Sequence, residues 1–291
     1  MTQPLDPLEM TEPAARPFTK FVGGKTQLLP ELLSRAPKFF GRYFEPFVGG
    51  GAMLFALAAA RSSDDPLRAF INDSNPWLMQ VYEAIRQNVD GVIRLLYDYE
   101  RQYRLHGEKF YYEVRKLGPT GEITEGGARL IFLLKTNYNG LWRVNRAGQY
   151  NVPHGKRKGL VTICDEDNLV RVSKVLQHTT CHWGDFQTSV DGNAVPGDFV
   201  YFDPPYVPVS ATADFTSYTK EAFGPGDQIR LRDCALSLKR RGVHVMLSNA
   251  DVPFVHELYG PGDFTIERVK ARRNINSKAD KRGKVGEVII T

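Results

Sequence analysis

The segment FVYFDPPY, residues 199–206, places an acid, two prolines and a tyrosine directly after a short apolar run. Each proline fixes its own φ angle and restricts the residue before it, so the backbone from Asp203 to Tyr206 has few available conformations. Pro204 and Pro205 also carry no amide donor, which leaves carbonyls to accept hydrogen bonds. A carboxylate, a carbonyl and an aromatic ring held in this way indicate a binding edge, although an ordinary strand end accounts for many Asp-Pro pairs.

A second segment, FEPFVGGGAM, joins a predicted strand to a predicted helix through three glycines. The spacing argues against two phosphate-binding motifs. A dinucleotide fingerprint needs a third glycine at the position that Leu54 occupies, and a phosphate loop needs Lys-Ser/Thr where this chain has Ala-Met. The GGKT at 23–26 has that ending, but Thr19 replaces its first glycine and no strand precedes it. A glycine turn with an acid about 20 residues later, here Asp73, suits a nucleoside cofactor such as S-adenosylmethionine. Asp73 also fits a helix N-cap.

These segments belong to an alternating order of strands and helices. Strands are predicted at 43–48, 68–73, near 180, and at 199–202, 243–249, 264–269 and 284–291, with helices at 52–61, 76–87, 165–177 and 227–241. This order predicts an α/β sheet domain. Residues from about 90 to 135 are charged and helical in pattern, and residues 136–159 predict a β-hairpin with a basic tip. We therefore expect an α/β sheet domain at 18–76 and 161–291, interrupted at 77–160 by an inserted helical module with a hairpin.

The composition is typical of a soluble globular protein, with 42% hydrophobic and 24% charged residues. A net charge of +5 weakly favours a polyanionic partner. Three scattered cysteines without a C-x-x-C spacing indicate a reducing compartment and argue against a zinc site. No apolar run reaches the length of a membrane span, and residues 1–17 predict a flexible polar tail without a signal peptide. We expect a monomeric cytoplasmic protein that holds no metal.

Seven blocks carry a family resemblance, namely FTKFVGGKTQLLPEL, FEPFVGGGAM, INDSN, YNGLWRVNRAGQYNVPHG, YFDPPYVPVSATADFTSY, MLSNAD and RRNINS. They occur in the order seen in Dam-type DNA adenine-N6 methyltransferases of the α group, and the chain resembles this family from about Phe18 nearly to its end. The resemblance implies a Rossmann-like methyltransferase sheet that uses S-adenosyl-L-methionine, with an inserted helical and β-hairpin domain that recognises DNA. It also implies methylation of adenine N6 in double-stranded DNA, with GATC as the target, in a bacterial or phage-infected cell.

The resemblance implies a set of cofactor-binding residues. Asp73 would bind the ribose, Asp185 and Phe186 would hold the adenine ring, and Lys25 would close over the cofactor. Phe21 would do the same, although family members often have Trp at this position. Phe47 and Phe186 also fit simple core aromatics, and for Phe186 taken alone this simpler interpretation is favoured. The full set is Phe21, Lys25, Phe47, Gly49, Gly51, Asp73, Asp185, Phe186 and Asp203.

The resemblance also gives the DPPY segment a chemical role. Adenine N6 is a poor nucleophile because its lone pair is delocalised into the ring, so the enzyme must position N6 in line with the methyl group and help the nitrogen become pyramidal. The Asp203 carboxylate would accept one N6–H, and the Pro204 carbonyl, locked by Pro205, would accept the other. Tyr206 would stack on the target base after it is flipped out of the duplex. No separate strong base is required.

The predicted hairpin would supply recognition of DNA. Arg143 suits a bidentate contact to a guanine edge, Leu141 suits a thymine methyl, and Tyr138 would fill the gap left by the flipped base. A solvated, charged hairpin also accounts for the basic residues of this segment. The remaining candidates for DNA contact are Lys20, Asn139, Asn145, Pro153 and Arg272.

Two other functions stay open at this stage. A DNA-binding relative without activity is disfavoured by the intact Asp73, Asp203, Pro204 and Tyr206. An amino methyltransferase acting on cytosine N4 or RNA adenine shares the chemistry, but Asp rather than Ser before PPY favours adenine. Both a solitary methyltransferase and the modification half of a restriction-modification pair fit these motifs.

Overall fold

Seven strands form one sheet in the order β3-β2-β1-β4-β5-β7-β6. The first five of these are mutually parallel, and β7 runs antiparallel to both β5 and β6. The strands are β1 Tyr43–Glu45, β2 Ala69–Asp73, β3 Thr179–Trp183, β4 Phe199–Phe202, β5 His244–Ala250, β6 Ile266–Ala271 and β7 Val285–Ile290. This computed structural model describes residues 13–19, 25–118, 121–156, 159, 161–207, 223–260, 262–271 and 285–291.

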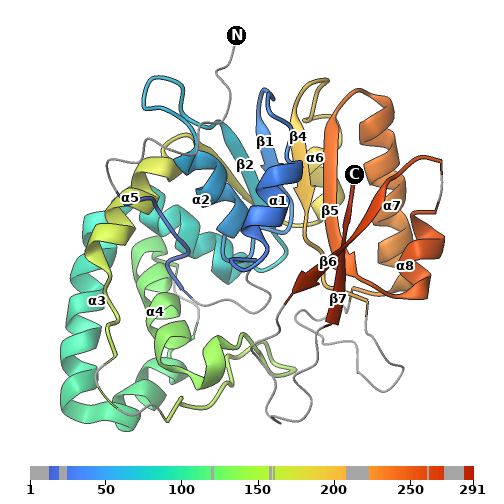
Figure 1. The fold of residues 1–291 in the computed structure, drawn as a ribbon. Coiled ribbons are helices and arrows are strands. Elements are labelled where there is room, and N and C mark those ends of the chain that lie inside the picture. Colours follow the sequence, from blue (N-terminus) through green and yellow to red (C-terminus); the bar gives the residue numbers. More distant parts are fainter. Residues whose placement is uncertain are drawn as a thin grey trace.

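Helices cover both faces of the sheet (Figure 1). The helices are α1 Leu29–Arg35, α2 Ala52–Ala59, α3 Pro76–Lys116, α4 Ile123–Thr136, α5 Glu166–Leu176, α6 Phe186–Val190, α7 Pro225–Arg240 and α8 Pro253–Leu258. Strand β4 shows how the layers form, because Phe199 and Tyr201 belong to the core under α1 to α5, whereas Val200 and Phe202 belong to the core under α6 to α8. All four residues are buried, as expected for a parallel strand covered on both faces.

The parallel strands bring the candidate residues to one edge of the sheet. The glycine turn follows β1, Asp73 ends β2, Asp185 follows β3 and Asp203 follows β4. Carboxyl ends of parallel strands meet at the same edge, and ligands of open α/β sheets bind there. The fold therefore gathers four segments that lie far apart in the sequence.

Several elements differ in extent from the sequence predictions. Strand β1 ends at Glu45, because Pro46 has no amide to continue the ladder. The short helices α1, α6 and α8 were not predicted. Helix α3 joins two predicted helical stretches, with non-helical backbone at Asn88 and Gly107. It begins beside the sheet and continues through the expected boundary at 76–77, so the division into domains remains a prediction.

The predicted hairpin follows α4 and is closed by two isolated antiparallel bridges, Asn137 with His154 and Val144 with Tyr150. The hairpin packs onto α3 through Trp142, whose ring lies 5.1 Å from that of Trp77. Figure 1 shows this segment reaching from the α3–α4 pair towards the β6–β7 side of the sheet. The hairpin is therefore anchored at its base by α3.

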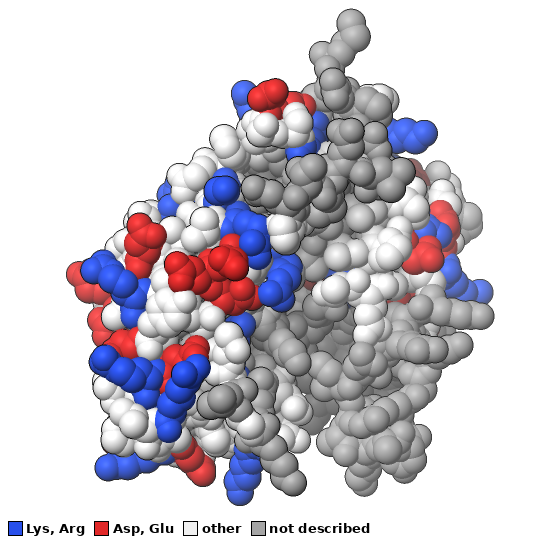
Figure 2. All heavy atoms as spheres, turned by 60° about the vertical axis from the view of Figure 1, so that its left-hand side comes forward, with Lys and Arg blue, Asp and Glu red and all other residues white. Residues whose placement is uncertain are grey.

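The outer face of the α3–α4 pair carries both signs of charge. Figure 2 shows Lys and Arg beside Asp and Glu on this side of the molecule. Much of the positive charge on α3 is neutralised along the helix, by the ion pairs Arg86–Glu83, Arg101–Asp98 and Arg104–Glu100. This face thus lacks the uniform basic character of a nucleic-acid surface.

Two further observations concern the part of the chain that the structure describes. None of its helices combines the length and apolar character needed to cross a bilayer. None of its His, Cys, Asp and Glu side chains gather in threes to form a metal site. Of the expected tail, residues 1–12 lie outside the described ranges, while Arg16 donates its amide to Asn168 on α5 at 3.0 Å.

Candidate active site

The turn after β1 depends on two glycines in the left-handed region, Gly49 at φ 48° and Gly51 at φ 71°. A Cβ atom on Gly51 would lie 2.7 Å from the Tyr82 hydroxyl, so this position also excludes a side chain by contact. The Tyr82 hydroxyl donates to the Gly49 carbonyl at 2.9 Å. The backbone of the turn, which carries no side chain at these positions, can thus approach a ligand closely, as glycine turns of nucleotide sites do.

A buried acid, Glu45, connects the two elements on either side of this turn. Glu45 at the end of β1 is 3% exposed, and its Oε2 accepts the amide of Leu54 in the first turn of α2 at 3.2 Å. Burial raises the pKa of Glu45 to about 8. The carboxyl group therefore ties the start of α2 to the strand that carries the glycine turn.

Asp73 joins the ends of β1 and β2. Its Oδ2 accepts the Gly49 amide at 3.1 Å and its Oδ1 accepts the Asn75 amide at 2.9 Å. The alternative of Asp73 as a helix cap is wrong, because Asn75 is the N-cap of α3 and accepts the amides of Trp77 and Leu78. Burial raises the pKa of Asp73 to about 6. A carboxylate has about four acceptor positions, so these backbone contacts do not use all of them and acceptor capacity remains for ribose hydroxyls.

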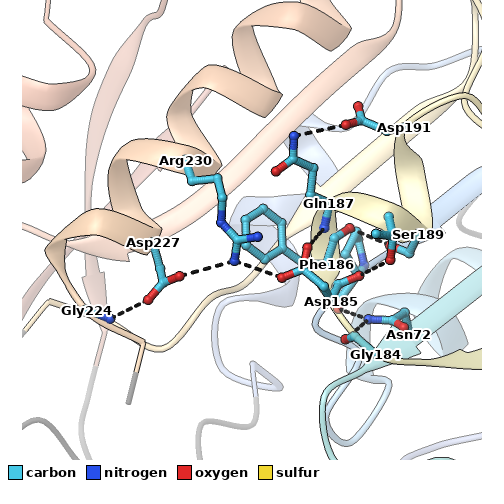
Figure 3. A network of polar contacts seen from close by, with 12 residues as sticks. Asn72, Gly184, Asp185, Phe186, Gln187, Ser189, Asp191, Gly224, Asp227 and Arg230 are labelled. Atoms are coloured by element: carbon cyan, nitrogen blue, oxygen red, sulfur yellow. Dashed lines mark hydrogen bonds and ion pairs between the residues drawn. The ribbon is translucent and has the colours of Figure 1, made fainter. Parts of the chain in front are cut away.

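Asp185 and Phe186 lie at the junction of β3 and α6 (Figure 3). Asp185 caps α6 by accepting the Gln187 amide at 2.9 Å, and its other oxygen pairs with Arg230 of α7 at 2.8 Å. Phe186 is 4% exposed and stacks on Phe47 with ring centroids 5.2 Å apart. The structure therefore brings Phe47, Asp185 and Phe186 together, with Arg230 as a partner that the sequence did not indicate.

Asp203 follows β4 and pairs with Lys25, whose Nζ lies 2.9 Å from its Oδ1. The side chains are only 16% and 11% exposed, so the pair is largely shielded from water. Burial raises the pKa of Asp203, and the nearby Lys25 acts in the opposite direction. Lys25 also lies 4.5 Å from the ring centroid of Tyr206. The cation thus contacts both ends of the DPPY segment.

The rest of the DPPY segment is held by three other elements. The Tyr206 hydroxyl donates to Oε2 of Glu287 on β7 at 2.9 Å. The Pro205 carbonyl accepts Nε2 of Gln228 on α7 at 2.9 Å. Asn249 on β5 accepts the Val207 amide at 3.4 Å. The segment is therefore a fixed edge that presents a carboxylate and an aromatic ring.

The comparisons with known proteins agree with this arrangement. The family described as D12 class N6 adenine-specific DNA methyltransferase matches residues 21–275. This chain belongs to that family. It is an adenine-specific DNA methyltransferase that depends on S-adenosylmethionine.

Three relatives span nearly the whole methyltransferase. The type II methyltransferase M1.LlaDCHI of Lactococcus lactis subsp. cremoris is 41% identical over 283 residues, covering 95% of each chain. The type II methyltransferase M.MjaIII of Methanocaldococcus jannaschii is 42% identical, covering 92% of this chain and 95% of its own. The DNA adenine methylase of Haemophilus influenzae is 31% identical, covering 94% and 92%. Each supports the same family.

The hairpin residues expected to contact DNA lie together, but they differ in exposure and in the hydrogen bonds that hold their side chains. Tyr138 is 46% exposed, and Asn139 has a left-handed backbone at φ 58°. Arg143 is exposed and donates Nε to Asn151 at 2.7 Å. Asn145 accepts the amides of Ala147 and Gln149 at 3.0 Å, so its side chain closes the tip.

Two more expected contacts frame the base of the hairpin. Leu141 is half-buried, and its carbonyl accepts the Tyr150 hydroxyl at 3.0 Å. Pro153 is exposed, and its carbonyl accepts the Tyr138 amide at 2.9 Å. Lys20, Phe21 and Arg272 lie outside the described residues.

The sequence missed the residues that hold the site in place. Gln228, Glu287 and Arg230 follow no motif, and only Asn249 falls within a block that carried the family resemblance, MLSNAD. A buried amide or acid that bonds a distant loop leaves no local pattern. These partners became visible only through contacts between elements.

Proposed function

We propose that the methyltransferase methylates N6 of adenine in double-stranded GATC sites, after flipping the base out of the duplex. The observation that carries the proposal is the DPPY segment, where Asp203 and Tyr206 lie next to each other at the carboxyl edge of the sheet and are held there by Lys25 and Glu287. A carboxylate beside an aromatic ring suits an extruded adenine, which stacks on the ring and donates its amino group.

The residues around the glycine turn fit S-adenosylmethionine. Gly49 and Gly51 allow close approach of the backbone, and Asp73 keeps acceptor capacity for ribose hydroxyls. Phe47 and Phe186 form an apolar, aromatic wall. Asp185, at the same wall, would accept the amino group of the cofactor adenine. When bound, the cofactor supplies an activated methyl group on a sulfonium.

The protein itself positions and orients the acceptor nitrogen. Asp203 accepts one N6–H and thereby draws lone-pair density onto the nitrogen, and the Pro204 carbonyl accepts the other. Lys25 keeps Asp203 in place, and its positive charge opposes the rise of the Asp203 pKa that burial causes.

The hairpin at 137–155 serves target recognition in this proposal. Arg143 reads a guanine edge, Leu141 contacts a thymine methyl and Tyr138 occupies the space left by the flipped base. Asn139, Asn145 and Pro153 contribute nearby contacts, and Lys20 and Arg272 belong to the same proposal. GATC itself rests on the likeness of the ordered blocks to Dam-type enzymes. The names of two relatives, type II methyltransferases, support a pairing with a restriction enzyme.

The experiment is expression in a host that lacks adenine methylation, followed by sequencing of modified bases in its DNA. We expect N6-methyladenine at GATC and at no other site. Methylation at a different sequence would overturn the target but keep the chemistry. A protein that binds S-adenosylmethionine and DNA without transferring the methyl group would instead be an inactive relative. A duplex with 2-aminopurine at the target adenine tests flipping, because unstacking raises its fluorescence.

A further inference from the structure

The amide of Gln228 is buried in the first turn of α7 and contacts the backbone of the DPPY segment. The residue is 2% exposed, its Nε2 donates to the Pro205 carbonyl at 2.9 Å, and its Oε1 accepts Nδ2 of Asn249 at 3.0 Å. Burial of an amide is unfavourable unless its groups are hydrogen-bonded, and here both ends are. The amide therefore has a defined task at this position.

The hydrogen-bond network determines which atom is the oxygen and which is the nitrogen in the side-chain amides of Gln228 and Asn249. Asn249 Oδ1 accepts the Ala250 amide at 2.9 Å, so it must be oxygen, and Asn249 Nδ2 must then donate to Gln228. Gln228 consequently accepts with Oε1 and donates with Nε2. Its donation to the Pro205 carbonyl follows from the chain of contacts, since a backbone carbonyl can only accept.

This network fixes the backbone on both sides of Tyr206. The Pro205 carbonyl precedes the ring and is held by Gln228, while the Val207 amide follows the ring and donates to Asn249. The hydroxyl of Tyr206 is held separately by Glu287. Because Pro204 and Pro205 have no amide hydrogens, the turn contributes few hydrogen bonds of its own, and its orientation depends on these outside partners.

We propose that Gln228 is a positioning residue for methyl transfer, which orients the Pro205–Tyr206 peptide and so aims the Tyr206 ring and the Pro204 carbonyl at the target adenine. The proposal rests on the function proposed above for Asp203, Pro204 and Tyr206. The same turn of α7 carries Arg230, which reaches Asp185 at the other end of the site (Figure 3). Helix α7 thus contacts both ends of the site, and through Gln228 it holds the end at which the methyl group is transferred.

The decisive variant is Gln228→Glu. A protonated carboxylic acid can donate to the Pro205 carbonyl and accept from Asn249, as glutamine does, whereas an ionised carboxylate has no hydrogen to donate and repels the carbonyl. Burial raises the pKa of a carboxyl group, so the glutamate introduced at position 228 should change its protonation state within the pH range of the assay. Relative to wild type, kcat of this variant should fall at least tenfold from about pH 6 to about pH 9.

Two controls isolate the hydrogen bond. Gln228→Met keeps the size of the side chain without its polar groups and should lower kcat by about tenfold to a hundredfold at every pH. Gln177→Glu makes the same substitution at a glutamine that donates to the Arg86 carbonyl at 2.8 Å, away from the site, and should follow wild type. The ionisable groups of neighbouring elements, Asp203, Tyr206, Asp227, Arg230, Asp251 and Glu287, are common to all variants, so ratios to wild type remove them.

The readouts separate positioning from folding and from binding. Calorimetric titration should give a dissociation constant for S-adenosylmethionine within about twofold of wild type for both variants at residue 228, and the loss should lie in kcat. The proposal would be overturned if the kcat of Gln228→Glu divided by that of wild type stayed constant across the pH series. It would also be overturned if Gln228→Met had the kcat of wild type. If Gln228→Met fails to fold, the pH series on Gln228→Glu decides alone. A wild-type protein that methylates no adenine would refute the proposed function instead.

Discussion

The DPPY segment and the tip of the hairpin are both irregular, yet they are held in opposite ways. The DPPY segment and the residue after it, Val207, form hydrogen bonds with Gln228, Asn249 and Glu287. The two residues of each pair are 23, 42 and 81 positions apart in the sequence, respectively. Partners at the hairpin tip lie within eight positions, as in Arg143 with Asn151 and Asn145 with Gln149.

This difference separates chemistry from recognition. The transfer site is fixed by two strands of the sheet and by helix α7, which packs on it, so a change in any of them alters the geometry around the reacting nitrogen. The hairpin tip carries its own hydrogen bonds on the surface, so its side chains can change without disturbing the sheet. Specificity and activity should therefore respond separately to mutation.

The largest expected effect is at Asp203. Asp203→Ala should reduce methyl transfer to background, because the acceptor of an N6–H is lost, while the affinity for S-adenosylmethionine stays within several-fold. Transfer of a tritiated methyl group to DNA measures activity, and calorimetry measures affinity. Asp203→Asn is the matched control for shape. Equal losses of affinity and activity would mean that Asp203 serves the cofactor rather than the base.

Asp73→Ala should instead act on the cofactor. Loss of two charge-assisted hydrogen bonds to ribose costs about 1–3 kcal/mol, which corresponds to roughly 5-fold to 150-fold in the dissociation constant. Activity at saturating cofactor should recover, in contrast to Asp203→Ala. Unchanged affinity in the titration would remove Asp73 from the cofactor site.

The raised pKa of Asp73 gives a pH dependence with a definite sign. The folded-state pKa is about 6, above the ordinary value of 3.8. Below about pH 6 the carboxyl gains a proton and loses acceptor capacity, so cofactor affinity should fall by up to about tenfold per pH unit. Asp73→Asn should bind more weakly but without this dependence. A dependence that persists in Asp73→Asn would have another origin.

Arg143→Ala tests the recognition side of the comparison. A lost bidentate contact to guanine should cost about 1–3 kcal/mol of discrimination at one base pair, while methylation of the altered site becomes more equal to GATC. Rates on GATC and on each singly altered site, at two salt concentrations, measure this. A uniform loss across sites with a salt slope lower by about one unit would assign Arg143 to phosphate instead.

Asn145→Ala should have the smallest effect. It removes the side chain that closes the hairpin tip, and we expect the free energy of unfolding to change by less than about 1 kcal/mol because the tip is exposed and local. Chemical denaturation measures it. A loss of several kcal/mol would show that the tip supports the fold, and the contrast with the DPPY segment would fail.

Local patterns in the sequence were sufficient for the parts of this protein whose geometry is local. Pro204 and Pro205 restrict their own backbone, the glycines after β1 allow the left-handed turn, and the strand at 199–202 is apolar throughout. These signals predicted an α/β sheet and the family resemblance that the comparisons confirmed. The turn residues at 136–159 likewise predicted a hairpin, and two antiparallel bridges close this segment in the structure.

Only the tertiary structure decided which side chains support the reacting groups. The sequence left Asp73 as either a ribose ligand or a helix cap, and the structure gives the cap to Asn75. Gln228 and Glu287 showed no pattern, because a hydrogen bond between α7 or β7 and the β4 loop depends on strand order, with β7 inserted between β5 and β6. Partners so distant in sequence meet only when the whole sheet has formed, so no local rule can name them.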